Sequence, residues 1–470
     1  MKKAHLIGIC GKAMGGLAVM YKEMGWEVTG SDEGFYDPVY SYLQKKGISF
    51  SEGYAAKNIP DDATCIVIGK HAKLVPESNV EVAAAFASDI PIKSLPQALG
   101  ELMLETDNIV VAGSFGKSTC TSIITWCLLQ AGKDPSYMIG AVPFGLPATS
   151  HYGTDSTFVI EGDEYPSSNW DPRSKFLHYN PKTILLTSGE HDHVNVFPTP
   201  EEYLLPYQQL VGLLPADGLL IASQDGAHVM SGIVPQTKTR TVTYGMNESA
   251  DWYAKDILYG EKTTFTLVRE ESEVIVLTTT LLGAYNVENI VGCAALLLEK
   301  NLLTLEELVK GIESFQGVSG RLDRKTANSS VLVYEAFGSS PAKLAAAFSA
   351  IKLHFPEKKV MAVFEPHTFG WRNRLTLPVY VNAFVAADAV IVYEPPSHGS
   401  ETHDQLTLKE IVSKIQETHA QVSAVRSMKQ GLERIESILM PEHLVLIVTS
   451  GELGGMIPEI PRLVERIYPA

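Results

Sequence analysis

The sequence predicts an α/β protein with three domains, and three observations support this. At 470 residues the chain is too long for one hydrophobic core, and its length corresponds to about three domains. Apolar, β-branched runs alternate with helical segments over most of the chain, which favours parallel sheets covered by helices. A charged segment at 101–107 and a glycine-bounded linker at 317–320 interrupt this alternation. We therefore predict domains over residues 1–107, 108–320 and 321–470.

The composition argues against two classes of partner. Hydrophobic residues make up 45% of the chain and charged residues 20%, as in soluble globular proteins. The net charge of −16 argues against a nucleic-acid partner, because such proteins carry a basic stripe. No run approaches the ~18 apolar residues that a membrane-spanning helix needs, so no membrane partner is expected. The five cysteines are scattered without C-x-x-C spacing, which favours a reducing, cytoplasmic location.

The first domain begins with a βαβ pattern. Residues 5–10 predict a strand, the glycine-rich turn at 11–16 leads into a helix, and residues 27–30 predict a second strand. Asp32 follows that strand, where a nucleotide-binding fold places an acidic ribose contact. The glycine spacing differs from G-x-G-x-x-G, and tight packing of the helix on the strand explains the glycines equally well. The pattern predicts a Rossmann-like domain.

A phosphate-binding loop is the most informative part of the chain. Residues 109–111 predict a buried strand, Gly113 and Gly116 form a turn, and a helix is expected from Lys117 onward. Backbone N–H groups of such a turn can converge on a phosphate, the lysine can reach the β- and γ-phosphates, and the two hydroxyl residues that follow can ligate Mg²⁺. The general pattern wants one more glycine, where Val111 stands. An ordinary strand-to-helix turn is the alternative, but the complete order of parts favours a P-loop ATPase-like domain.

Two strand ends in the same domain carry candidate metal ligands. Glu161 is the first of three carboxylates after an apolar strand at 158–160, and hard oxygen ligands suit metal-assisted phosphate chemistry. A solvated acidic loop is the alternative. His193 follows another strand, and Asp192 or Glu190 could orient its ring. Because no cysteine or third histidine lies nearby, the pattern favours Mg²⁺ over zinc.

The last part of the chain repeats the alternation, which predicts a second Rossmann-like domain. Strands are expected at 331–334, 360–364, 389–393 and 444–449. Three of them end in polar segments: Glu365-Pro366-His367, Glu394-Pro395-Pro396 and Ser450-Gly451-Glu452. Open α/β sheets bind ligands at such carboxyl ends. Arg321, Arg372 and Arg374 could bind a carboxylate or a phosphate, although lone surface arginines are common.

Taken together, these motifs resemble the Mur ligases, three-domain ATP-dependent enzymes that build the peptidoglycan peptide. The glycine-rich first turn, G-S-F-G-K-S-T, the strand end at Glu161, the E-H-D-H segment at 190–193 and the segment at 283–289 occur in the order and spacing of that family. The resemblance runs nearly end to end. It implies an ADP-forming amide ligase that phosphorylates a carboxylate of a UDP-sugar and lets an amine displace the phosphate. Monomer and homodimer are both left open.

The resemblance also implies roles for individual residues, with ATP and Mg²⁺ as cofactors and a UDP-sugar and an amino acid or peptide as small-molecule substrates. The catalytic residues would be Lys117, Glu161 and His193, and the Mg²⁺ ligands Ser118, Glu161 and His193. The nucleotide would be bound by Gly113, Gly116, Lys117, Ser118, Thr119, Asn286, Asn289 and Arg321. Substrates would contact Gly11, Met14, Gly15 and Asp32 in the first domain and His367, Arg372 and Arg374 in the last. Helix capping is the alternative for the two asparagines.

Several positions depart from the family pattern. Ala336 and Ser339 stand where the family usually has an aspartate and a histidine that contact the nucleotide, and Tyr285 replaces another histidine. These departures predict ATP contacts from the third domain that differ from those of the family. They also leave open a ligase with another carboxylate substrate and a non-catalytic nucleotide-binding homologue. No lysine lies between Lys182 and Lys238, where other branches carry a carbamylated lysine, which favours the branches that use UDP-N-acetylmuramate.

Overall fold

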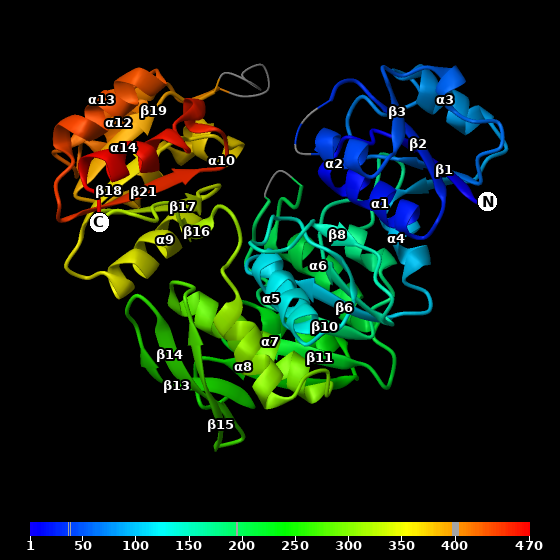
Figure 1. The fold of residues 1–470 in the computed structure, drawn as a ribbon, viewed down its shortest axis with the longest axis horizontal. Coiled ribbons are helices and arrows are strands. Elements are labelled where there is room, and N and C mark those ends of the chain that lie inside the picture. Colours follow the sequence, from blue (N-terminus) through cyan, green and yellow to red (C-terminus); the bar gives the residue numbers. More distant parts are fainter. Residues whose placement is uncertain (36, 38, 194–195, 397–403) are drawn as a thin grey trace. The chain divides into compact units, whose positions relative to one another are not determined.

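The protein is an α/β structure with three sheets, as the sequence predicts (Figure 1). The computed structural model describes residues 1–35, 37, 39–193, 196–396 and 404–470. Within these ranges no helix has both the length and the apolar character needed to cross a bilayer. All five cysteines are buried, and none of them is in a disulfide.

The N-terminal sheet is parallel throughout. Its strands are β1 (Lys3–Ile7), β2 (Glu27–Asp32), β3 (Ser49–Glu52), β4 (Cys65–Ile68) and β5 (Ile92–Ser94). Its helices are α1 (Lys12–Glu23), α2 (Val39–Lys45), α3 (Val80–Ala87) and α4 (Leu95–Leu102). The strand order is β3-β2-β1-β4-β5, with every neighbouring pair parallel. This is the predicted Rossmann-like arrangement, in which strands are added to both sides of β1.

The central sheet has ten strands. They are β6 (Asp107–Ala112), β7 (Ser136–Met138), β8 (Ser150–His151), β9 (Thr157–Glu161), β10 (Thr183–Leu186), β11 (Leu219–Ser223), β12 (Arg240–Gly245), β13 (Trp252–Leu258), β14 (Thr263–Arg269) and β15 (Ser272–Thr279). The helices are α5 (Lys117–Gln130), α6 (Pro200–Gly212), α7 (Ala284–Glu299) and α8 (Leu305–Ser314). The order is β15-β14-β13-β12-β11-β10-β6-β9-β7-β8. Because β10, β6 and β9 are parallel neighbours, their carboxyl ends meet at one edge.

The C-terminal sheet has six strands. They are β16 (Arg321–Arg324), β17 (Leu332–Phe337), β18 (Lys359–Phe364), β19 (Ala389–Tyr393), β20 (Val422–Val425) and β21 (His443–Thr449). The helices are α9 (Pro341–His354), α10 (Phe369–Arg372), α11 (Tyr380–Ala383), α12 (Leu408–Ile415), α13 (Met428–Ile438) and α14 (Glu459–Ile467). The order is β16-β17-β21-β18-β19-β20, and only the β16–β17 pair is antiparallel. The carboxyl ends of β18, β19 and β21 therefore lie together.

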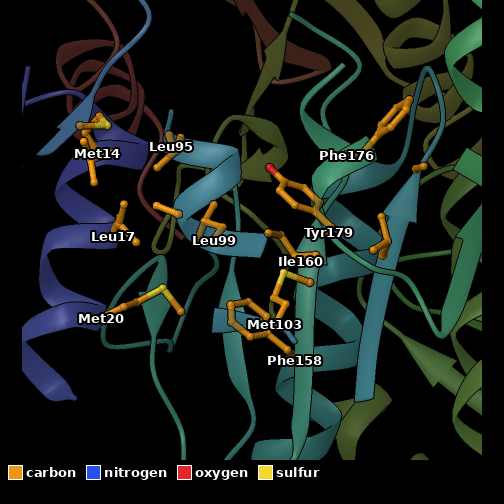
Figure 2. Packing of buried hydrophobic residues seen from close by; sticks show 14 of the residues in the cluster. Met14, Leu17, Met20, Leu95, Leu99, Met103, Phe158, Ile160, Phe176 and Tyr179 are labelled. Carbon is orange, nitrogen blue, oxygen red and sulfur yellow. The ribbon is translucent and has the colours of Figure 1, made fainter. Parts of the chain in front are cut away.

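The chain divides into two compact units, and the N-terminal and central sheets share the first. That unit comprises residues 1–257, 264–279 and 285–316, and the second comprises 258–263, 280–284 and 317–470. One continuous core joins both sheets of the first unit, as Figure 2 shows for Leu17 of α1, Leu99 of α4 and Phe158 of β9. The predicted boundary at 107/108 falls inside this unit, so the three-domain division stays a prediction.

Two elements differ from the sequence-based expectation for clear reasons. The strand expected at 5–10 ends at Ile7, because Gly8 turns the chain with a φ of +83°. Helix α4 was not predicted within the segment before β6. It begins with a capping box between Ser94 and Gln97, in which each side chain bonds the other residue's backbone N–H. The S-x-x-Q spacing is the local signal that would have predicted this helix.

A buried polar network around Glu81 holds the N-terminal domain together. The Glu81 side chain is fully buried, and its Oε1 lies 2.7 Å from His5 Nε2 and accepts from Ser31 Oγ at 2.7 Å. Its Oε2 accepts from the backbone N–H of Ala55 and from Asn58 Nδ2, both at 2.8 Å. Burial alone would raise the pKa of Glu81, but these hydrogen bonds hold it below its ordinary value. The carboxylate thus links α3, β1 and β2.

Glu81→Ala should lower the free energy of unfolding by about 3 kcal/mol or more, because several buried donors lose their acceptor at once. Urea unfolding followed by circular dichroism measures this. Glu313→Ala, at an exposed position in α8, serves as the control and should stay within about 0.5 kcal/mol of the parent. Similar small effects of both substitutions would contradict the structural role of Glu81.

Candidate active site

The loop between β6 and α5 contains two glycines that no other residue can replace easily. Gly113 has a φ of +134° and Gly116 a φ of +80°. A Cβ on Gly113 would lie 2.1 Å from Thr187 Oγ1, and a Cβ on Gly116 would lie 2.6 Å from Asn289 Oδ1. Both positive φ and close approach therefore require glycine. The loop leads into the first turn of α5, where half-buried Thr119 lies and where a helix leaves its N–H groups unpaired.

Lys117 is paired with a buried carboxylate that was absent from the predicted site. Its Nζ lies 2.9 Å from Glu164 Oε2 and also donates to the carbonyl of Gly113. Burial alone would lower the pKa of Lys117, but the charge of Glu164 outweighs it and raises this pKa above its ordinary value. Burial likewise opposes ionisation of Glu164, whose side chain is 2% exposed, yet Lys117 and His193 lower its pKa to about 2. Both partners are therefore ionised.

Ser118, in the first turn of α5, meets Glu161 at the carboxyl end of β9. Ser118 Oγ donates to Glu161 Oε1 at 2.9 Å, and the backbone N–H of Gly140 donates to Glu161 Oε2 at 2.8 Å. Parallel pairing of β6 and β9 brings these residues together across 43 positions of sequence. A hydroxyl and a carboxylate side by side form the hard-oxygen pair that Mg²⁺ prefers.

The ring of His193 is oriented by residues other than the predicted ones. Its Nδ1 lies 2.8 Å from Tyr165 Oη, and its Nε2 lies 3.2 Å from Glu164 Oε1. Asp192 Oδ1 is 3.8 Å from Nδ1 and accepts the backbone N–H of His193 instead. The expectation that Asp192 or Glu190 orients the ring is thereby corrected. Glu164 and Tyr165 belong to the same acidic segment as the predicted ligand at 161, which was the available sequence signal.

The structure does not form the zinc pair that H-x-H spacing alone would suggest. His191 Nε2 lies 2.8 Å from the carbonyl oxygen of Phe197, so this ring supports the loop. Among the described residues, no three histidine, cysteine, aspartate or glutamate side chains are grouped to hold a metal ion. A cation bound near Ser118 and Glu161 would therefore take further oxygens from the nucleotide or from water.

Asn286 and Asn289 lie inside α7, past its first residue, so helix capping does not explain them. They are 4% and 8% exposed, and Asn289 Nδ2 donates to Asn286 Oδ1 at 3.2 Å. Asn289 Oδ1 accepts from the thiol of Cys120 in α5 at 3.4 Å and is the atom that a Cβ on Gly116 would meet. The two asparagines thus support the phosphate loop from α7.

The glycine-rich turn of the first domain is shaped by packing. Met14 is 5% exposed and lies in the shared core (Figure 2), so its predicted substrate contact cannot come from its side chain. A Cβ on Gly15 would lie 2.5 Å from a valine of α2. Asp32 Oδ2 accepts the backbone N–H of Cys10 at 2.8 Å and thereby closes the turn onto β2. Gly11, at the N-cap of α1, is exposed.

Three strand ends of the C-terminal sheet form an acidic hollow of about 560 Å³. Glu365, His367, Glu394 and Glu452 are among the residues that line it. His367 Nδ1 lies 3.6 Å from Glu365 Oε1. The meeting of these strand ends agrees with the sequence-based expectation, and His367 is the one predicted substrate residue in this lining.

The predicted arginines of the C-terminal domain are engaged within it. Arg372 is 4% exposed, and its Nη1 donates to the carbonyl of Pro396 at 3.0 Å. Arg374 lies at the surface and forms ion pairs with Asp404 at 2.5 Å and Glu410 at 2.7 Å. Neither arginine lines the acidic hollow. The structure therefore does not bring these two predicted substrate residues together with His367.

Arg321 lies beside Ala336, one of the positions at which the chain departs from the family pattern. It pairs with buried Ala336 across β16 and β17, and its guanidinium carbon lies 4.6 Å from the centre of the Phe337 ring. Ser339 Oγ accepts from Lys343 Nζ at 2.9 Å. Ala336 is apolar, and the hydroxyl of Ser339 is hydrogen-bonded to Lys343. Neither residue therefore offers a charge to a nucleotide.

The cluster in the first unit suits a nucleotide with Mg²⁺. Lys117 supplies a cation at the loop, and His193 supplies a nitrogen that is linked to Lys117 through Glu164. Ser118 and Glu161, which are hydrogen-bonded to each other, supply oxygens. The same donor set is typical of enzymes that transfer a phosphoryl group. Fold and site together define a nucleotide-dependent α/β enzyme.

Comparison with known families identifies which enzyme class this is. The family model described as Mur ligase family, catalytic domain, matches residues 3–106, the Mur ligase middle domain matches 111–297, and the Mur ligase, glutamate ligase domain, matches 320–451. The chain belongs to the Mur ligase family, whose members are ATP-dependent, ADP-forming amide ligases.

Two kinds of relative are similar to the chain over nearly its whole length. UDP-N-acetylmuramate--L-alanyl-gamma-D-glutamyl-meso-2,6-diaminoheptandioate ligase of Escherichia coli is 27% identical, covering 97% of this chain and 96% of that protein. UDP-N-acetylmuramate--L-alanine ligase of Chlorobium phaeobacteroides is 30% identical, covering 97% of this chain and 96% of that protein. The crystal structure of UDP-N-acetylmuramate-alanine ligase from Thermotoga maritima covers 99% of both chains with a TM-score of 0.78, and at 20% identity it shows the fold alone.

Gly116→Ala should abolish measurable ATP binding in isothermal titration calorimetry, because the added Cβ meets Asn289 and φ is positive. Gly212→Ala at the end of α6 is the matched control, since a Cβ there meets nothing within 4 Å. The control should bind ATP like the parent. Undiminished ATP affinity of Gly116→Ala would refute the assignment of this loop.

Proposed function

We propose that the chain joins the lactoyl carboxylate of UDP-N-acetylmuramate to the amine of L-alanyl-γ-D-glutamyl-meso-diaminopimelate, with ATP converted to ADP, in peptidoglycan recycling or synthesis. The observation that carries the catalytic part is the linked cluster of Lys117, Glu164 and His193 beside Ser118 and Glu161. The choice of peptide is supported by the similarity to the Escherichia coli ligase named for this tripeptide. We place the enzyme in the cytoplasm, in keeping with its buried free thiols.

The proposed division of labour follows the three sequence segments. Residues 1–107 would bind the UDP-sugar at the glycine turn, residues 108–320 would bind ATP, and residues 321–470 would bind the amine. The acidic hollow supports the last assignment, because the incoming amine is a cation before it loses a proton. The exposed N-cap at Gly11 supports the first, since helix N-termini favour phosphate groups.

The residues of the central site would act by position and charge. Lys117 would neutralise charge on the γ-phosphate as it moves to the carboxylate, and the amine would then displace phosphate from the acyl phosphate. Ser118 and Glu161 would serve one Mg²⁺ site, and His193 would serve a second. When bound, Mg²⁺ would supply further neutralisation of the transferring group.

L-Alanine is the second candidate for the amine. The similarity to UDP-N-acetylmuramate--L-alanine ligase, at 30% identity over the same length, favours it as strongly as the other relative favours the tripeptide. A ligase with another acid and a non-catalytic homologue are the remaining alternatives. A non-catalytic protein would have no need to keep Lys117 paired with buried Glu164.

ADP release measured with a panel of amines distinguishes these alternatives. With UDP-N-acetylmuramate and ATP·Mg²⁺ present, the tripeptide should give the highest kcat/KM, and omission of either substrate should stop ADP formation. A higher kcat/KM with L-alanine than with the tripeptide would contradict the tripeptide hypothesis and favour L-alanine as the substrate. If ADP appears only with a different acid, the UDP-N-acetylmuramate assignment fails, and if it never appears, the ligase assignment fails.

Lys117→Ala should reduce kcat by roughly 100-fold or more, because the site loses its cation for the transferring phosphoryl group. Steady-state ADP release measures this reduction. Lys182→Ala, which removes an exposed lysine elsewhere in the same unit, should leave kcat within about twofold. A Lys117→Ala enzyme with turnover near that of the control would exclude the proposed role.

A further inference from the structure

We propose that Glu164 and Tyr165 together set the state of the His193 ring: Glu164 fixes the tautomer with the proton on Nε2, and Tyr165 covers the Nδ1 lone pair until a cation replaces the hydroxyl. Both are positioning residues that act through His193. The part that concerns the cation rests on the proposed function, whereas the tautomer is a property of the ligand-free protein.

The tautomer follows from the partner of Nε2. Glu164 forms an ion pair with Lys117 Nζ at 2.9 Å, so its carboxylate is charged and can only accept hydrogen bonds. His193 Nε2 lies 3.2 Å from the other oxygen of this carboxylate. A lone pair on Nε2 would face a negative oxygen, so Nε2 carries the proton. Oε2 of Glu164 thus contacts Lys117, and Oε1 contacts His193.

The lone pair of the ring then lies on Nδ1, where Tyr165 meets it. Tyr165 Oη is 2.8 Å from Nδ1, and in the neutral ring the hydroxyl has to be the donor. Asp192 Oδ1, at 3.8 Å, is too far from Nδ1 for a hydrogen bond. The aromatic ring of Tyr165 also packs on His193, with centroids 4.7 Å apart.

This arrangement has a direct consequence for a cation that uses His193. Histidine binds a metal through a nitrogen that has no proton, and the other nitrogen then donates to a carboxylate, a backbone carbonyl or water. Here the protonated Nε2 already faces the carboxylate of Glu164, so Nδ1 is the nitrogen that a cation could bind. To bind Nδ1, the cation has to displace the hydroxyl of Tyr165. The hydrogen bond between Tyr165 and His193 is then lost, and this loss lowers the affinity of the site for the cation.

Nitrogen NMR of the ligand-free protein tests the tautomer. Protein labelled with ¹⁵N-histidine should show His193 with the proton on Nε2 at pH 8, with the signal assigned by its loss in His193→Gln. Glu164→Gln offers one acceptor oxygen to two donors, so the Nε2–H preference should weaken in that variant. A proton on Nδ1, or an imidazolium at this pH, would overturn the inference.

Cation binding tests the role of the tyrosine hydroxyl. Mn²⁺ titrated into the protein with a non-hydrolysable ATP analogue, and followed by electron paramagnetic resonance, should bind about three- to tenfold more tightly to Tyr165→Phe than to the parent, the range expected for one lost hydrogen bond. Tyr152→Phe, which also removes one hydroxyl from the same unit, should match the parent. Equal or weaker Mn²⁺ binding by Tyr165→Phe would overturn this part.

The two proposals can fail separately. A protein with the Nε2–H tautomer that never releases ADP would contradict the ligase assignment and leave the tautomer inference standing. An active ligase whose His193 carries its proton on Nδ1 would contradict the tautomer inference and leave the ligase assignment standing.

Discussion

The candidate active site depends on the ion pair that the carboxylate of Glu164 forms with Lys117 and on its contact with His193. This carboxylate is almost fully buried, and it holds Lys117 through one oxygen and His193 through the other. Three elements of the site, the phosphate loop, the end of β9 and the segment after β10, are thereby fixed relative to one another. A buried carboxylate without partners would be costly, so each side chain stabilises the other two. The charge of the site is set before any nucleotide arrives.

The phosphate loop is held in place by close packing of its glycines against neighbouring side chains rather than by further charged groups. Gly113 has no room for a side chain against Thr187, and Gly116 has none against Asn289. These contacts press the loop onto β10 and α7, so the positions of its backbone N–H groups depend on both elements. The absence of the usual first glycine, where buried Val111 stands inside β6, is consistent with this. Strand packing, rather than loop flexibility, is required at that position.

Local patterns predicted the parts of the site but not how they join. The phosphate loop, the strand end at Glu161 and the acidic strand ends of the last domain could be found because each depends on a short run of sequence. The pairing of Lys117 with Glu164 joins residues 47 positions apart, and parallel register alone brings them together. Strands β13–β15 were not predicted, although residues 263–267 alternate between buried and half-buried positions. These consecutive strands have no helices between them and so depart from the βαβ pattern. Arg374 was expected to bind a ligand because its guanidinium suits a carboxylate or a phosphate. Its protein partners Asp404 and Glu410, 30 and 36 positions away, give no local signal in the sequence.

The C-terminal domain differs from the central site in how its charges are used. In the central site the cation of Lys117 is paired with the buried carboxylate of Glu164. In the C-terminal domain the arginines are taken up by Pro396, Asp404 and Glu410, while carboxylates line the hollow. A surface of this sign repels phosphates and attracts ammonium groups. The uncharged residues Ala336 and Ser339 agree with this, and the charges of the domain therefore support the proposal that it binds the amine rather than the nucleotide.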